Sequence, residues 1–190
     1  MATRGRPSNM FQPFNPKQKL GTALVCVCLA WVCAGGERGM PAQDGVGNFG
    51  KVNGLLFRGA QPDETGLKSL KQLGVKTIIN LRMANDAWPL EEAEARANGM
   101  AYFNVPLNGV GRPGDAQVSK VLSIIDSSLD PVFVHCQHGC DRTGTIIACY
   151  RIAHDKWSAK EALREAKQFG MSRLERRMKS YVVDFAKAKK

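Results

Sequence analysis

Short apolar runs alternate with helical patterns from residue 55 to the end of the chain, and this alternation constrains the fold more than any other feature. The runs that predict buried strands are Leu55–Phe57, Val75–Leu81, Met100–Val105 and Pro131–His135. Strands that alternate with helices pack into layers, with the helices covering a mainly parallel sheet. We therefore predict an α/β fold: a single layered domain with a central, mainly parallel sheet flanked by helices.

Helical segments are indicated by apolar residues at helical spacing and by residues typical of helix ends. The first is predicted from Asp63 to Leu73, where Gly74 is a typical C-terminal cap, and the second over residues 89–99. Asp115 is a candidate N-cap for the third helix. A fourth helical pattern starts at Thr143, directly after a glycine-containing loop.

Two capping boxes predict the last helices. They are Ser158-x-x-Glu161 and Ser172-x-x-Glu175, in which a hydroxyl and a carboxylate satisfy the free amides of the first turn. The apolar face expected for the final helix consists of Leu174, Met178, Tyr181, Val182 and Phe185. Basic side chains occupy its other positions, which is typical of a solvated face.

Composition bounds the kind of protein. The chain has 190 residues, of which 44% are hydrophobic, so it has enough apolar side chains for one packed domain and is not a disordered protein. The formal net charge is +10. A basic domain favours anionic ligands, either phosphorylated substrates or nucleic acid, and the charge does not choose between them.

The first 34 residues have the pattern of an export signal. A basic, proline-containing start precedes the uncharged run Leu20–Ala34, and Val32–Ala34 offers a small-residue cleavage site. The run is short for a membrane helix, which needs about 20 apolar residues. We therefore expect export to the periplasm, cell surface or medium, with an uncleaved membrane anchor or a buried core helix as alternatives. Glycine-rich residues 35–53 are predicted to be a linker to a domain at 54–190.

The informative chemistry lies where the last predicted strand meets the helix that follows it. The two are joined by the sequence His135-Cys136-Gln137-His138-Gly139-Cys140-Asp141-Arg142-Thr143-Gly144. Backbone amides at such a junction point towards one spot and the helix dipole favours negative charge, so a phosphate is the expected guest. We predict that residues 137–142 form the phosphate-binding loop.

The same environment suits a nucleophile. Amides and a helix N-terminus favour the thiolate form of Cys136, which makes it nucleophilic at neutral pH. The Arg142 guanidinium can hold two phosphate oxygens in a bidentate fork, more strongly as charge spreads in the transition state. Thr143 places a hydroxyl near the sulfur, where it can help the thiolate leave a phosphocysteine intermediate. The six cysteines fit no paired zinc motif, and no metal site is expected.

This junction resembles the Cys-x5-Arg-Ser/Thr signature of the protein tyrosine and dual-specificity phosphatase superfamily. The segments Leu56–Pro62 and Val75–Arg82 are similar to the first part of its small bacterial dual-specificity type. The resemblance covers about residues 50–185 and implies a dual-specificity-phosphatase-like catalytic domain at 54–190. It further implies a phosphocysteine mechanism that uses no metal and no cofactor, and a shallow pocket.

Alternative functions have weaker support. Rhodanese-type sulfurtransferases share the strand-loop-helix arrangement, but their loop between Cys and Arg is normally one residue shorter. A catalytically weak phosphate-binding module is the alternative that is not an enzyme. Phosphorylated proteins are the expected substrates and phosphoinositides the alternative, because Gln137, His138 and Cys140 stand where lipid phosphatases often carry lysines. No nucleic acid partner is expected, and membrane association is possible through the N-terminal segment.

The resemblance also implies an aspartate that protonates the leaving oxygen and later activates water. Asp115 follows the loop from which dual-specificity phosphatases usually present this acid, but it competes with a role as a helix cap. Asp141 lies beside Arg142, in a Gly-x-Asp-Arg-Thr pattern that resembles myotubularins and some bacterial phosphatases. We favour Asp141, with Asp115 as the alternative; the structural interpretation of Asp141 is a carboxylate that braces the loop.

Overall fold

A five-stranded sheet forms the centre of the computed structural model, which describes residues 43–189. Across the sheet, the order of the strands is β1-β2-β5-β3-β4. Their bounds are Gly50–Lys51 for β1, Leu56–Gly59 for β2, Val132–His135 for β5, Thr77–Asn80 for β3 and Ala101–Asn104 for β4. Strand β1 is antiparallel to β2 and all other neighbours are parallel, so the predicted mainly parallel sheet is confirmed.

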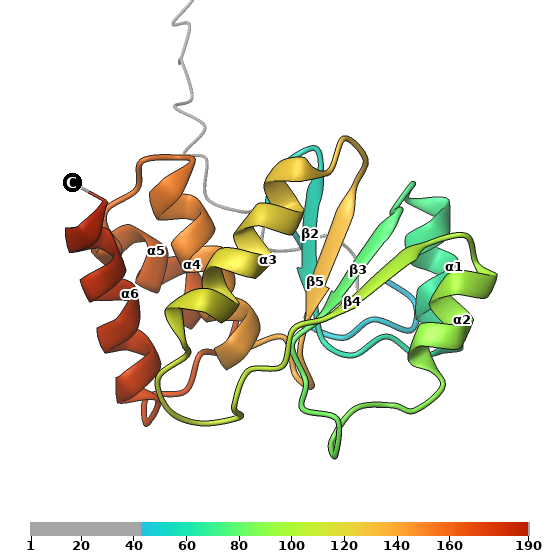
Figure 1. The fold of residues 1–190 in the computed structure, drawn as a ribbon, viewed down its shortest axis with the longest axis horizontal. Coiled ribbons are helices and arrows are strands. Elements are labelled where there is room, and N and C mark those ends of the chain that lie inside the picture. Colours follow the sequence, from blue (N-terminus) through green and yellow to red (C-terminus); the bar gives the residue numbers. More distant parts are fainter. Residues whose placement is uncertain (1–42, 190) are drawn as a thin grey trace, which may run out of the picture. The chain divides into compact units, whose positions relative to one another are not determined.

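Helices cover both faces of the sheet, as Figure 1 shows. One face carries α1 (Glu64–Gln72) and α2 (Glu91–Ala97). The other carries α3 (Asp115–Ser127), α4 (Asp141–Ala153), α5 (Ala159–Gln168) and α6 (Arg176–Ala188). Among these helices, none is both long and apolar enough to cross a membrane.

Successive strand residues supply two separate cores, one on each face. Phe57 and Ile78 pack with Leu67 of α1 in the smaller core. Their sequence neighbours Leu56 and Ile79 point the other way, into the larger core with α3, α4 and α6. Parallel strands buried on both faces have nearly continuous apolar sequences, which explains why the prediction succeeded for β2, β3 and β5, whose residues are all buried.

All four parallel strands end at the same edge of the sheet. Their last residues, Gly59, His135, Asn80 and Asn104, lie in register across the sheet. The loops that follow these strands therefore meet, and ligands of open α/β sheets bind at this carboxyl edge. Cys136 directly follows β5 at this edge.

The predicted linker at 35–53 is wrong over residues 43–53. This segment contains β1, and its Phe49 ring stacks on Phe57 with 5.7 Å between centroids. Val46 is also buried in the core beneath α1. The domain thus begins no later than residue 43, because these apolar side chains complete the smaller core. Residues 35–42 and the predicted signal or anchor at 1–34 lie outside the described residues.

Two predicted helix starts also differ from the structure. Gly114, and not Asp115, is the N-cap of α3, and its N–H donates to Gln117 Oε1 at 2.9 Å. The capping box at Ser158 and Glu161 is confirmed for α5. No helix begins at Ser172; α6 starts four residues later, at Arg176, and Leu174 is 85% exposed instead of joining its apolar face.

Candidate active site

Cys136 and Arg142 are held in a loop that leaves β5 and enters α4, as the sequence predicted. Helix α4 begins at Asp141, two residues before the predicted start, so Arg142 lies in its first turn. Both side chains are nearly buried, Cys136 at 3% and Arg142 at 6% exposure. The sulfur and the guanidinium therefore lie at a helix N-terminus shielded from bulk water, where an anion is favoured.

The loop passes closely over the β2–α1 connection, and Gly139 makes this possible. Its φ is +69°, in the left-handed region, and an added Cβ would lie 2.5 Å from the backbone carbon of Gly59. A second backbone contact joins the two segments, since the N–H of Gln61 donates to Gln137 O at 3.2 Å. Only a residue without a side chain fits at position 139.

Gly139→Ala is therefore expected to destabilise the fold by at least about 1–2 kcal/mol, the cost of a left-handed non-glycine residue. Because the substitution displaces the loop, the variant should also lose most of its phosphatase activity. Gly54→Ala is the matched control, since nothing lies within 4 Å of its added Cβ, and it should not lower stability. Urea unfolding and turnover of an aryl phosphate measure both effects; equal stability of the two variants would contradict the close approach.

Arg58, on β2, contacts the buried side of the loop between Cys136 and Arg142. Its side chain is 1% exposed, its Nη2 donates to Gly139 O at 2.6 Å, and its guanidinium lies 4.0 Å from the centroid of the Phe169 ring. Burial lowers the pKa of Arg58 to about 10, so the group stays charged at neutral pH. A buried positive charge behind the loop favours a bound phosphate. Sequence reasoning gave Arg58 no role.

Asn48 is a second support that sequence reasoning missed, because it lies in the predicted linker. Its side-chain amide donates to His138 O at 3.1 Å, to Phe169 O at 3.0 Å and towards Cys140 Sγ at 3.4 Å. Its own backbone has φ +49°, a conformation that asparagine tolerates better than most residues. Asn48 thus ties the phosphate loop to the end of α5.

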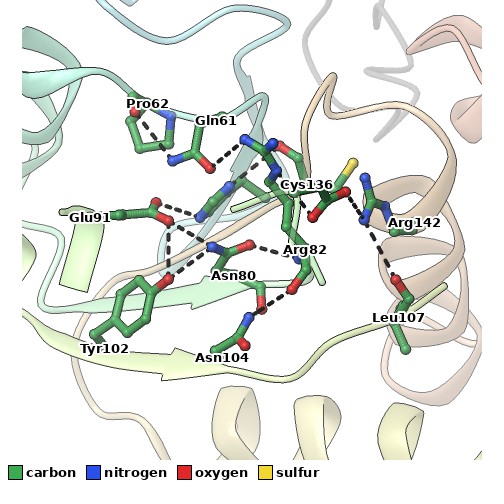
Figure 2. Close-up of polar contacts among 12 residues, drawn as sticks. Gln61, Pro62, Asn80, Arg82, Glu91, Tyr102, Asn104, Leu107, Cys136 and Arg142 are labelled. Atoms are coloured by element: carbon green, nitrogen blue, oxygen red, sulfur yellow. Dashed lines mark hydrogen bonds and ion pairs between the residues drawn. The ribbon is translucent and has the colours of Figure 1, made fainter. Parts of the chain in front are cut away.

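Loops from two other strands contact Arg142. Its Nη1 donates to Asp86 Oδ2 at 3.2 Å and makes a long contact of 3.5 Å with Leu107 O. Figure 2 shows Arg142 at this contact with Leu107, and Cys136 in the same region of the site. Asp86 follows β3 and Leu107 follows β4, so the guanidinium is oriented by both neighbouring loops.

Asp86 was not a candidate in the sequence analysis. Its second oxygen, Oδ1, lies 3.6 Å from Arg82 Nε, so the carboxylate pairs with two arginines. The signal that would have indicated it is its place six residues after the end of a parallel strand, at the edge where ligands bind.

The two predicted general acids have other partners. Asp141 Oδ1 accepts the backbone N–H of Ser172 at 2.7 Å. Burial, and after it the nearby Asp115 carboxylate, raises the pKa of the Tyr181 hydroxyl. Within residues 43–189, no hydrogen bond or ion pair joins either aspartate to Arg142. Their role as acid stays a prediction.

The remaining predicted loop residues are placed as follows. Gln137 and His138 are exposed at the mouth of the loop. Cys140 Sγ donates to His138 O at 3.2 Å, and burial raises the pKa of this thiol. Thr143 is buried, and its Oγ1 has no hydrogen-bond partner among the described residues. Residues 43–189 contain no group of three or more His, Cys, Asp or Glu side chains placed to hold a metal ion.

A buried polar network continues from the loop into the smaller core. His135 Nε2 lies 2.8 Å from Glu91 Oε1, and both side chains are fully buried. Glu91 Oε2 accepts hydrogen bonds from Asn80 Nδ2 at 2.7 Å and from the Tyr102 hydroxyl at 3.1 Å (Figure 2). Burial alone would raise the pKa of Glu91, but His135 and hydrogen bonds, among them that from Tyr102, outweigh it and lower the pKa.

Glu91→Gln is expected to destabilise the protein by about 3 kcal/mol, because it removes one partner of a buried pair. Glu92→Gln, the neighbouring change in an exposed pair with Arg96, should cost less than about 1 kcal/mol. Since the pKa of Glu91 is lowered by folding, its contribution is present at neutral pH and is lost as the pH falls through that pKa. Urea unfolding at neutral and acidic pH measures this; two variants of equal stability would contradict the network.

Comparison with known proteins places this site in a family. Residues 43–183 match the family model described as "DSP-PTPase phosphatase fused to NAD+ Kinase". The chain is 31% identical over 125 residues to the dual specificity protein phosphatase TpbA of Pseudomonas aeruginosa. This alignment covers 65% of this chain and 55% of TpbA. It is 28% identical over 132 residues to Inositol diphosphatase DSP4 of Arabidopsis thaliana, covering 66% of this chain and 65% of that protein.

Solved structures agree with the sequence comparison. The crystal structure of P. aeruginosa TpbA matches with a TM-score of 0.67 and 28% identity, covering 83% of this chain and 98% of that chain. A TpbA variant in complex with pTyr matches with a TM-score of 0.67 and 27% identity, covering 84% of this chain and 98% of that chain. The chain spans about half the length of curated TpbA. With its loop from Cys136 to Arg142 between β5 and α4, this chain belongs to the dual-specificity protein tyrosine phosphatase (DSP-PTPase) family.

Proposed function

We propose that this protein is a cysteine-dependent phosphatase that hydrolyses phosphate monoesters on proteins, either phosphotyrosine or phosphoserine and phosphothreonine. The observation that carries the proposal is the pair of nearly buried side chains, Cys136 and Arg142, in one loop at a helix N-terminus. A thiolate and a guanidinium are the two groups that transfer of a phosphoryl group to sulfur requires.

In this proposal, the loop amides and the N-terminus of α4 bind the phosphate, and Arg142 binds two of its oxygens. The Cys136 thiolate then attacks phosphorus and forms a phosphocysteine intermediate, which water hydrolyses. Arg58 supports the step electrostatically, because its charge lies buried directly behind Gly139. The Thr143 hydroxyl, which has no hydrogen-bond partner within residues 43–189, is available to stabilise the departing thiolate in the second half of the reaction.

Phosphoproteins are the first substrate class that we propose. The support is the likeness to TpbA, a dual specificity protein phosphatase with a structure in complex with pTyr. A second class, inositol diphosphates, is favoured by the likeness to Inositol diphosphatase DSP4 of Arabidopsis thaliana. The excess of basic side chains over the whole chain suits either kind of anion.

Kinetics of the purified protein on a matched panel separate these classes. The panel contains phosphotyrosine, phosphoserine and phosphothreonine peptides of one sequence, an inositol pyrophosphate, and a phosphoinositide in vesicles. We expect the highest kcat/KM for a phosphopeptide. A higher kcat/KM for the inositol pyrophosphate would replace the first substrate class by the second, and no turnover of any panel member or of an aryl phosphate would overturn the phosphatase.

We further propose that residues 1–34 direct export or anchor the protein at a membrane. The support is their sequence alone: a basic start, the uncharged run Leu20–Ala34 and small residues at its end. N-terminal sequencing of the native protein should find a chain that begins near Gly35 if the signal is cleaved, and a membrane-bound chain with the intact segment if it is an anchor. A chain in the cytosol that starts at Met1 would exclude both.

A further inference from the structure

The reaction proposed for this site needs a group that gives a proton to the leaving oxygen. When the phosphoryl group moves to Cys136, the electron pair of the broken bond goes to the leaving oxygen, which needs a proton unless it is a weak base. Asp141 and Asp115 are the candidates from the sequence, but Asp141 accepts the backbone N–H of Ser172, and within residues 43–189 no hydrogen bond or ion pair joins Asp115 to Arg142. A third carboxyl group, that of Asp86, does contact Arg142.

Asp86 lies against the arginine that would hold the phosphate. Its Oδ2 is 3.2 Å from Arg142 Nη1, and its side chain is 34% exposed. Two acceptors held by one guanidinium are neighbours in space. A phosphate bound by Arg142 would therefore lie next to the Asp86 carboxyl group.

The loop that carries Asp86 is anchored on both sides of it. A turn is closed by the Asp86 N–H, which donates to Met83 O at 3.0 Å. Before this turn, Arg82 is fixed by its backbone bond to Asn80 Oδ1 at 2.7 Å and by its Nη1 bond to Gln61 Oε1 at 3.1 Å (Figure 2). After it, Trp88 packs against the smaller core. The carboxyl group is thus presented from a fixed position.

We propose that Asp86 is the general acid of the phosphoryl transfer, an assignment that rests on the phosphatase function proposed above. The Asp86 carboxyl group is paired with Arg142 and Arg82. A phosphate dianion that binds Arg142 takes over part of this pairing and repels the carboxylate. Uptake of a proton by Asp86 relieves the repulsion between the two negative groups and loads the acid when substrate arrives.

The steps balance without a co-reactant other than water. The Cys136 sulfur bonds to phosphorus, the bond from phosphorus to the leaving oxygen breaks, and Asp86 gives that oxygen its proton. A water molecule then attacks phosphorus and passes a proton to the Asp86 carboxylate. The bond from phosphorus to sulfur breaks with its electrons returning to Cys136, and inorganic phosphate leaves.

The dependence on the leaving group tests this role. For Asp86→Asn, kcat should fall by about 10²–10⁴-fold on alkyl phosphates and phosphoserine peptides, the usual share of general acid–base catalysis. On aryl phosphates with strongly acidic phenols the loss should be less than about tenfold, since such leaving groups need no proton. Asp86→Ala should give the same pattern, so the test survives if one variant is poorly folded. Glu92→Gln, which removes an exposed carboxylate of α2, should leave kcat unchanged on both classes.

Two results would overturn the assignment. One is an equal loss on all leaving groups in the Asp86 variants, which would make Asp86 a positioning residue for Arg142. The other is leaving-group dependence in Asp141→Asn or Asp115→Asn but not in Asp86→Asn. Failure of the phosphatase proposal itself is distinguishable, because the unsubstituted protein would then turn over neither class of substrate.

Discussion

Cys136→Ser is expected to lose about 10⁴-fold or more in kcat, the scale of loss seen when an enzyme loses its nucleophile. A serine hydroxyl in the same loop stays protonated at neutral pH and cannot replace the thiolate. The loop amides and Arg142 are untouched, so a phosphotyrosine peptide should still bind. Turnover is measured with an aryl phosphate, and binding by isothermal titration calorimetry.

Cys149→Ala is the control for the loss of a thiol. Cys149 lies on α4 in the larger core, and burial raises the pKa of its thiol to about 12, so it is not a nucleophile at neutral pH. This variant should keep its activity at some cost in stability. Turnover by Cys136→Ser at the rate of the unsubstituted protein would show that another group attacks phosphorus.

Arg142→Lys should lower kcat/KM by about 10²–10³-fold although the charge is kept, a loss typical of removing a donor to transition-state charge. A lysine ammonium has no planar fork and cannot hold two phosphate oxygens at once. It also cannot reproduce the contacts of the guanidinium with Asp86 and Leu107, which orient the group before substrate binds. Both binding of a phosphopeptide and turnover should therefore weaken.

Arg164→Lys provides the matched control, since Arg164 is exposed on α5. It should leave kcat/KM within about twofold, as surface substitutions usually do. If Arg142→Lys kept full kcat/KM on an alkyl phosphate, Arg142 would act as a simple positive charge and not as a fork.

The sequence predicted the parts of the fold that local pattern controls. The strands within 75–81 and 131–135 are buried at every residue because helices cover both faces of the sheet, so their apolar runs stand out. The strand within 100–105 lies at the edge of the sheet and its residues are mostly exposed, but the buried Met100 and Val105 flank it. Strand β1 has two residues and forms only because β2 is present to pair with it. No local pattern indicates such a strand, and glycines at positions 45, 47 and 50 suggested a linker instead.

In the site too, the residues that are contiguous in sequence were predicted and those brought in by the fold were not. Cys136, Arg142 and the loop between them are contiguous in sequence, so the motif located them. Asp86 and Asn48 reach the loop from positions 56 and 92 residues away from their partners Arg142 and Cys140, and only the order of the strands brings them there. Asp141 is next to Arg142 in the sequence, but the first turn of α4 directs its carboxylate to the Ser172 backbone, which no pattern in the sequence indicated.

Trapping of the covalent intermediate tests the central proposal most directly. The purified protein is mixed with a phosphatase substrate that carries a radiolabelled phosphate, quenched in acid during turnover, and digested for peptide mapping. A phosphocysteine mechanism predicts label on the peptide that contains Cys136, in the unsubstituted protein and not in Cys136→Ser. Turnover that leaves no label on Cys136 in any quenched sample, or label on another residue that persists in Cys136→Ser, would contradict it.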